Sequence, residues 1–450
     1  MSEPGQAPIW HKGIRAADWV TRFTVGDDPV WDTLLLPFDC IASEAHAWGL
    51  AQIGVLTGAE HAQIASELAK IQAEHAAGRI VVETADEDCH TVIERRLTET
   101  LGDVGRKIHT GRSRNDQVLT ALRLWLRDHL AATGRKTARL AEILCALGAD
   151  GEDVVMPGYT HMQRAMPSTV GLWALGYAEL LVSDLAGLGE TAARIDLSPL
   201  GSAAGYGVPY LELPREAVAR RMGFKGVQLH ATSVQLSRGK FEAEAVHALV
   251  QIAATVNRLA SDLVLFSTAE FAFVHLPDAF TTGSSIMPQK RNPDVLELAR
   301  ATFHRLAAEL QVLLAIPANL MSGYHRDLQP TKAAVMSALL TTEDLLDAMI
   351  AVLGGLEFDE ARLKAAMSAD LYATAAALKR VAGGEPFRDA YRSAAVDVSA
   401  WETEGGRSVH ETYRTTGSPG RTDPGAVLGQ LRRASAWLQP PPTEEQARQR

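Results

Sequence analysis

Apolar residues between positions 241 and 266 restrict the possible folds of this chain more than any other feature. Six of them form two rows, each with a spacing of seven residues: Leu249, Val256, Leu263 and Ile252, Leu259, Phe266. Interleaved heptad rows are typical of helices that pack nearly parallel, as in bundles and coiled coils. The helix would have about 26 residues and a length of roughly 40 Å. This apolar stripe is longer than one small chain needs for its own core, so we also expect the helix to pack against other subunits.

Composition supports a helical protein. The chain has 450 residues, enough for two or three domains with a large buried core. Alanine and leucine dominate, which favours helix, and strand signals are scarce. The predicted fold is all-α, with three mainly helical domains and a central bundle of long helices.

Glycine-rich connections suggest where these domains begin and end. A glycine-punctuated segment at 102–111 and Gly354-Gly355 bound the long-helix region. The predicted domains are an N-terminal helical domain (1–108), a central long-helix bundle (109–355) and a small C-terminal helical domain (356–450) with a disordered tail from Pro440. Residues 1–30 are expected to be irregular, and Thr57 is expected to cap a helix.

Charge and cysteine content exclude several classes of protein. The formal net charge of −10 argues against a general nucleic-acid surface. The three cysteines are far apart and form no Cys-x-x-Cys motif, so we expect neither a disulfide framework nor a metal site of that kind. The N-terminus lacks an apolar signal core, and no uncharged apolar run reaches membrane-spanning length. We therefore expect a cytoplasmic protein without a membrane or nucleic-acid partner.

Residues 282–294 form the segment with the most specific local chemistry. Glycine and two serines at its start predict a mobile turn. Asn292, Pro293 and Asp294 then predict a helix start, with Asn292 as N-cap and Pro293 in the first helical position. With Lys290 beside it, such a start is a place where an anion can bind. Each of these features alone is explained equally well by an ordinary surface turn before a helix.

Two further segments gather polar side chains next to turns. Residues 109–117 combine arginine, serine and asparagine, with Asn115 or Asp116 expected to cap a long helix. Residues 157–163 contain His161, whose neutral-range pKa suits proton transfer. Without other information, residues 109–117 are best explained as a helix cap with solvated arginines. A lone histidine such as His161 is likewise more often structural than catalytic.

Together these three segments resemble the aspartase/fumarase superfamily. The Met-Pro-Gln-Lys and Asn-Pro-Asp strings within 282–294 are most similar to its argininosuccinate lyase branch, and the resemblance covers roughly residues 20 to 400. It implies elimination of fumarate from argininosuccinate to give arginine, without a metal or other cofactor. It also implies a homotetramer of long-helix bundles in which three subunits build each active site.

The resemblance assigns roles to fourteen residues. The implied catalytic residues are Ser284 as general base, Lys290 as the charge that stabilises its alkoxide, His161 as candidate proton donor and Glu297 as the partner of that histidine. The implied substrate-binding residues are His90, Thr91, Ser113, Arg114, Asn115, Thr160, Asn292, Tyr324, Gln329 and Lys332. Lys290 and Asn292 would hold the carboxylate next to the reacting carbon, and Gln329 and Lys332 would bind other carboxylates of the substrate.

The chain departs from the family near its N-terminus. The gap between Arg22-Phe23 and the helix that contains Asp39 is short, and Met166 stands where glutamine is common. These departures leave the fumarate-forming half intact and affect the contacts to the arginine half. Two alternatives therefore stay open. One is a related carbon–nitrogen lyase that acts on another N-substituted aspartate, and the other is a crystallin-like structural relative.

Overall fold

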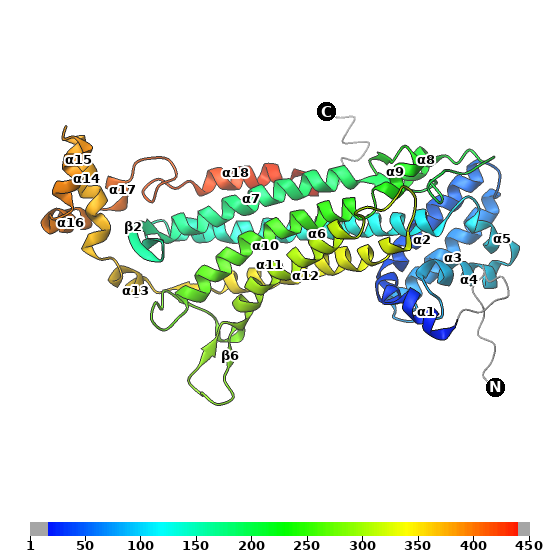
Figure 1. The fold of residues 1–450 in the computed structure, drawn as a ribbon, viewed down its shortest axis with the longest axis horizontal. Helices are drawn as coiled ribbons and strands as arrows, with labels where there is room; N and C mark the ends of the chain where they lie inside the picture. Colours follow the sequence, from blue (N-terminus) through cyan, green and yellow to red (C-terminus); the bar gives the residue numbers. More distant parts are fainter. Residues whose placement is uncertain (1–16, 440–450) are drawn as a thin grey trace. The chain divides into compact units, whose positions relative to one another are not determined.

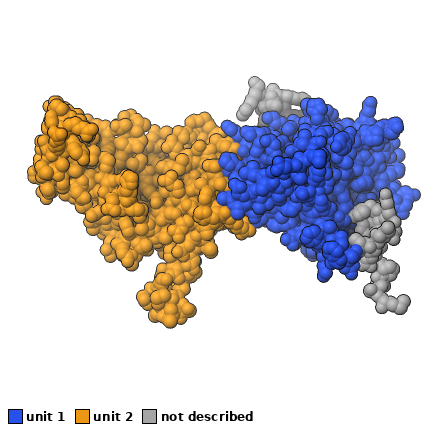
Figure 2. Space-filling view, in the orientation of Figure 1, with its two compact units in different colours: residues 1–131, 190–247, 307–340 blue, residues 132–189, 248–306, 341–450 orange. Residues whose placement is uncertain are grey.

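The computed structural model describes residues 17–439, which are predominantly helical with a few short strands (Figure 1). They divide into two compact units, coloured separately in Figure 2. Unit 1 contains the described residues of 1–131, 190–247 and 307–340, and unit 2 those of 132–189, 248–306 and 341–450. The all-α class is confirmed. The three sequential domains stay a prediction, because these units follow a different division, and the expected disordered tail lies outside the described residues.

Five long helices contribute residues to both units. They are α6 (Arg114–Asp150), α7 (Val170–Ile195), α10 (Lys240–Phe266), α11 (Asp294–Ala315) and α12 (Pro330–Gly354). The bounds of α10 confirm the helix predicted from the heptad rows. The six residues of those rows are at most 5% exposed within this single chain. The rows are therefore already buried and give no support to packing between subunits.

Unit 1 also contains helices that lie entirely within it. They are α1 (Asp18–Val25), α2 (Asp28–Gln52), α3 (Gly58–Ala76), α4 (Cys89–Leu101), α5 (Asp103–Arg106), α8 (Arg215–Arg221) and α9 (Ala231–Leu236). The expectation of an irregular segment before residue 30 was wrong, because α1 and the start of α2 occupy its described part. Thr57 forms the predicted capping box with Glu60 at the start of α3. Strands β3 (Leu197–Ser198) and β4 (Gly226–Val227) pair in parallel.

Unit 2 contains a hairpin that the sequence reasoning missed. Strands β1 (Val155–Thr160) and β2 (Gln163–Thr169) pair antiparallel through a two-residue turn. Both turn residues, His161 and Met162, have positive φ angles of 53° and 60°. Positive φ at both positions belongs to the tight hairpin turns that match strand twist, which asparagine and glycine usually occupy. Neither residue is of that type, so the local sequence carried no hairpin signal.

The remaining elements of unit 2 are short. Strand β5 (Val274–His275) pairs with β8 (Glu357–Phe358), and β6 (Thr282–Gly283) pairs with β7 (Arg291–Asn292). The helices after α12 are α13 (Glu360–Ala365), α14 (Ala373–Ala382), α15 (Phe387–Ala394), α16 (Val398–Gly405), α17 (Val409–Thr412) and α18 (Pro424–Ala434). Three of them, α14 to α16, share a small core of alanines packed against Trp401.

Two predicted helix starts need correction. Ser113, not Asn115 or Asp116, caps α6, because its Oγ accepts the Asn115 amide and its own amide donates to Asp116 Oδ1. At α11 the Pro293 carbonyl accepts the first helical hydrogen bond, from the Glu297 amide. Pro293 is therefore the cap, and Asn292 lies in β7 instead. In both cases the cap is within a few residues of the predicted one.

Two segments pass a test of length and hydropathy for a membrane span, although both contain charged residues. They are Val170–Ile195 and Ala231–Phe266, with 44% and 56% of the tested windows buried inside the protein. Asp184 of α7 accepts a hydrogen bond from Thr255 of α10 at 2.7 Å, so these helices pack through polar contacts within unit 2. Buried core helices pass the same test, and this finding is weak evidence for a membrane.

Candidate active site

A pocket of about 620 Å³ lies in unit 1 among the starts of α2, α4 and α6 and the segment before α12. It collects side chains that are far apart in the sequence. Seven of the predicted substrate-binding residues line it: His90, Ser113, Arg114, Asn115, Tyr324, Gln329 and Lys332. The structure thus brings these seven residues together in one pocket, and their roles toward a substrate remain predictions.

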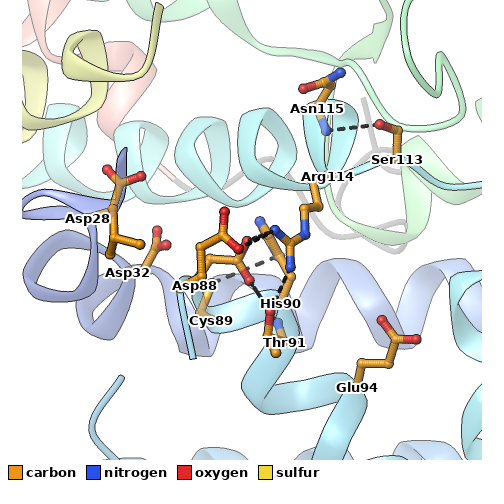
Figure 3. A network of polar contacts seen from close by, with 12 residues as sticks. Asp28, Asp32, Asp88, Cys89, His90, Thr91, Glu94, Ser113, Arg114 and Asn115 are labelled. Atoms are coloured by element: carbon orange, nitrogen blue, oxygen red, sulfur yellow. Dashed lines mark hydrogen bonds and ion pairs between the residues drawn. The ribbon is translucent and has the colours of Figure 1, made fainter. Parts of the chain in front are cut away.

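The start of α4 supplies the first group of polar contacts (Figure 3). Asp88 caps the helix, and its Oδ1 accepts hydrogen bonds from the Thr91 amide at 2.8 Å and the Thr91 hydroxyl at 2.7 Å. Arg114 donates to the Thr91 hydroxyl at 2.8 Å and forms ion pairs with Glu87 and Asp88. Burial opposes the charge of Asp88, but His90 and Arg114 outweigh it and lower the pKa of the carboxyl. The start of α6 is therefore held against that of α4.

His90 is oriented by a buried carboxylate. Its Nδ1 lies 2.8 Å from Asp39 Oδ2, while its buried Nε2 has no hydrogen-bond partner among the described residues. Burial favours the neutral ring, but Asp39 outweighs this effect and raises the pKa of His90. A ring held through Nδ1 presents Nε2 as the atom that is free to interact. The sequence analysis used Asp39 only to locate a helix and predicted no role for it.

Asp39, His90 and Cys89 also form a group of metal-ligand types whose atoms lie within 4.8 Å of one another. Burial raises the pKa of the Cys89 thiol well above its ordinary value, which disfavours the thiolate that a metal requires. Asp39 is already engaged with the His90 ring. This chemistry does not favour a metal site.

The predicted carboxylate binders Gln329 and Lys332 make contacts that the sequence reasoning did not foresee. Gln329 Nε2 donates to the Thr24 carbonyl at 2.9 Å and the Val25 carbonyl at 3.2 Å. Lys332 Nζ lies 2.7 Å from Asp32 Oδ1 and 3.0 Å from Asp28 Oδ1. These contacts fasten the start of α12 to α1 and α2.

Acidic side chains form much of the pocket wall, and sequence reasoning missed them. The pocket is lined by Asp28, Asp32, Glu87, Asp88 and Glu94. The first two lie four residues apart in α2, a spacing that places both on one face of a helix. Two carboxylates one helical turn apart were the available signal. Facing cationic side chains, they make a pocket of mixed charge that suits a ligand bearing both signs.

Buried Arg112 borders the same pocket. It donates to Ser43 Oγ at 2.8 Å and is 7% exposed. Burial, together with Arg112 and Arg114, lowers the pKa of nearby His109 to about 4. His109 is therefore neutral near pH 7, whereas the arginine side chains of the pocket are charged.

The segment 282–292 forms the β6–β7 hairpin, which projects from the body of unit 2 (Figure 1). Its tip is exposed, with Ile286 83% accessible to solvent. Ser284 Oγ accepts hydrogen bonds from the Ile286 amide at 3.3 Å and the Met287 amide at 3.1 Å. Donors that point at a hydroxyl oxygen favour its anionic form. Among the described residues no hydrogen bond joins Ser284 to Lys290, so that pairing stays a prediction.

The other predicted catalytic residues, and the predicted substrate-binding residue Thr160, also belong to unit 2. Thr160 ends β1, His161 lies in the hairpin turn and Glu297 lies in the first turn of α11, all three exposed. In residues 17–439 no hydrogen bond or ion pair joins His161 to Glu297. Their pairing therefore remains a prediction.

Comparisons with known proteins agree with the family that the sequence motifs resemble. The family described as "Lyase" matches residues 21–307. The argininosuccinate lyase of Stenotrophomonas maltophilia is 43% identical over 416 residues, covering 92% of this chain and 95% of the relative. The argininosuccinate lyase of Sorangium cellulosum is 44% identical over 418 residues, with the same coverage of both chains. The chain belongs to the argininosuccinate lyase family. It is accordingly a lyase, an enzyme that acts on a small-molecule substrate.

Solved structures agree with this assignment at the level of the fold. An EDDS lyase variant with bound fumarate superposes with a TM-score of 0.73 at 25% identity, covering 95% of this chain and 91% of the other. A fumarate lyase:delta crystallin from Brucella melitensis superposes with a TM-score of 0.72 at 21% identity, covering 90% and 97%. At the identity of the second structure the likeness concerns the fold alone.

Proposed function

We propose that this protein is an argininosuccinate lyase, which eliminates fumarate from argininosuccinate and leaves arginine. The observation that carries the proposal is the match to curated argininosuccinate lyases over 92% of the chain and 95% of the relatives. The mixed charge of the pocket supports it, because argininosuccinate carries carboxylates, an ammonium group and a guanidinium group.

The proposed chemistry begins with removal of a proton from the carbon beside a carboxylate. Loss of this proton creates a second negative charge on that part of the substrate, and fixed donors stabilise it. Ser284 acts as the base, with the Ile286 and Met287 amides and the ammonium of Lys290 stabilising its alkoxide. Asn292 binds the carboxylate at which charge develops, together with the same lysine. His161, assisted by Glu297, protonates the leaving nitrogen.

We further infer a cytoplasmic homotetramer in which three subunits complete each active site. The predicted binding residues of the pocket all lie in unit 1, whereas Thr160, His161, Ser284, Lys290, Asn292 and Glu297 all lie in unit 2. Large apolar side chains of the long helices remain exposed in the single chain, such as Leu180 at 47% and Leu298 at 69%. Such residues suit contacts with further subunits. Light scattering on the purified protein measures the mass: four chains support this inference, and a monomer contradicts it.

Release of fumarate from argininosuccinate, followed by absorbance, tests the proposed activity. A substrate panel separates the alternatives, and it includes EDDS because solved EDDS lyases share this fold. Fumarate formed fastest from argininosuccinate supports the proposal. Faster turnover of another N-substituted aspartate would identify a related lyase, and no turnover of any substrate would point to a structural relative.

A further inference from the structure

The amino-acid end of the proposed substrate is a zwitterion, with an α-carboxylate and an α-ammonium group on the same carbon. Recognition of both groups requires a cation and a carboxylate side by side. The resemblance to the family assigns substrate carboxylates to Gln329 and Lys332, next to the start of α12. It assigns no residue to the ammonium group, which therefore needs a negatively charged partner in the same part of the pocket.

The first residue of α2 places a carboxylate there. Asp28 Oδ1 lies 3.0 Å from Lys332 Nζ, and Asp28, Gln329 and Lys332 all line the pocket. Among the described residues, Asp28 Oδ2 has no hydrogen-bond partner, and the side chain keeps 19% of its surface accessible. One oxygen of Asp28 thus holds the lysine, and the other is free to accept a hydrogen bond from a ligand.

Asp32, one helical turn further along α2, is a carboxylate with a purely structural role. Its Oδ1 lies 2.7 Å from the same Lys332 Nζ, but the residue is 1% exposed and its Oδ2 is fully buried. The two aspartates therefore share the lysine and differ in accessible surface. Asp32 fixes the ammonium group of Lys332, whereas Asp28 presents a carboxylate oxygen beside it.

The protein compensates the charge of Asp28 only in part. Burial raises the pKa of its carboxyl and outweighs the attraction of Lys332 and Arg326. Arg238 also faces Asp28, while Asp88 adds a negative charge nearby. A carboxylate whose pKa stays raised despite these cations is stabilised by one further positive group at its accessible oxygen.

We propose that Asp28 is a substrate-binding residue whose Oδ2 accepts a hydrogen bond from the α-ammonium group of the arginine moiety. The assignment rests on the proposed function and adds to it a determinant for the amino-acid end. The α-carboxylate binds beside it, at the positions predicted for Gln329 and Lys332. Asp28 lies in the short stretch between Arg22-Phe23 and Asp39 where the chain departs from its family, so this contact belongs to the arginine half that the departure affects.

The reverse reaction isolates this contact when arginine is compared with des-amino-arginine, which lacks only the α-amino group. Each is combined with fumarate, and the loss of fumarate absorbance gives kcat/KM. We expect the parent enzyme to prefer arginine by about 10- to 100-fold, the value of one charge-assisted hydrogen bond. Asp28→Asn keeps the shape without the charge, and we expect it to lower this preference about tenfold, mainly through a higher KM for arginine. Both compounds retain the α-carboxylate, so a change at Lys332 affects them alike.

Asp27→Asn is the matched control. Asp27 precedes Asp28, is exposed and does not line the pocket. We expect this variant to keep the parent's preference for arginine. We also expect Asp28→Asn to keep a thermal midpoint near the parent's, because Asp32 still pairs with Lys332. An Asp28→Asn enzyme that prefers arginine as strongly as the parent would overturn the proposal, and so would an equal loss of preference in both variants.

Ligand-induced stabilisation separates failure of this inference from failure of the proposed function. If the parent consumes no fumarate with either compound, the proposed function fails. Arginine should still raise the thermal midpoint of the parent more than des-amino-arginine does, and Asp28→Asn should reduce this difference. Equal stabilisation of the parent by both compounds would refute the ammonium contact itself, without recourse to any variant.

Discussion

Replacing Lys332 with methionine is expected to destabilise the protein by about 3–5 kcal/mol near neutral pH. Lys332 is 5% exposed and Asp32 1%, and Asp28 is the second carboxylate on the same ammonium. Methionine has a similar length, so the loss of packing is small. The cost comes from leaving two carboxylates largely out of water without the ammonium group that pairs with both.

The pH dependence of this effect has a definite sign. Burial alone would lower the pKa of Lys332, but Asp32 and Asp28 outweigh it and raise the pKa above its ordinary value of 10.5. The pair therefore stabilises the folded protein fully below pH 10.5 and loses this contribution as the pH rises through the higher folded pKa. In the variant the unpaired carboxyls take up protons more easily, so its deficit should shrink as the pH falls into the acidic range.

Urea unfolding followed by circular dichroism measures the destabilisation as a shift of the midpoint. Lys70→Met is the matched control, because Lys70 pairs with Glu67 but its side chain is 64% exposed, and we expect a loss below about 1 kcal/mol. Adding Asp32→Asn to Lys332→Met should recover part of the loss, since one uncompensated charge disappears. A Lys332→Met protein as stable as the Lys70→Met control, or a strictly additive double variant, would refute the reasoning.

Two further predictions concern single contacts. Asp39→Asn removes the carboxylate that raises the pKa of His90, so an NMR titration should show the ring losing its proton at lower pH than in the parent; an unchanged titration would contradict the assigned cause. The His90–Asp39 contribution to stability is fully present below pH 6.5 and is lost as the pH rises through the raised folded pKa. Thr57→Ala removes half of the capping box of α3 and should cost about 1 kcal/mol by urea unfolding, whereas Thr57→Ser should restore most of it; an Ala variant as stable as the parent would show that the cap contributes nothing.

Much of the fold could be predicted from hydrophobic periodicity and from helix-capping residues. The heptad rows of α10 predicted its bounds to within a residue, and Thr57 marked the start of α3. The β1–β2 hairpin escaped because His161 and Met162 adopt positive φ angles that their residue types do not announce. The helix start at Ser113 was misplaced, because several adjacent polar residues could each cap and only their mutual hydrogen bonds decide among them.

The candidate site, like the fold, could be predicted from the sequence only in part. Motifs pointed to seven of the residues that line the pocket, because the motif residues carry recognisable chemistry at short spacing. They did not predict pairing between distant segments, such as Lys332 with two aspartates of α2, about 300 residues away.

The central claim is that the Ser284 hydroxyl removes the proton, and the most direct measurement compares fumarate release from argininosuccinate by the parent, Ser284→Ala and Ser285→Ala. Ser285 is the neighbouring serine of the same exposed loop and serves as the matched control. We predict that Ser284→Ala lowers kcat by about 10²- to 10⁴-fold, as expected for loss of a general base, while Ser285→Ala stays close to the parent. A Ser284→Ala enzyme that releases fumarate at the parent's rate, with an unchanged thermal midpoint, would contradict the claim.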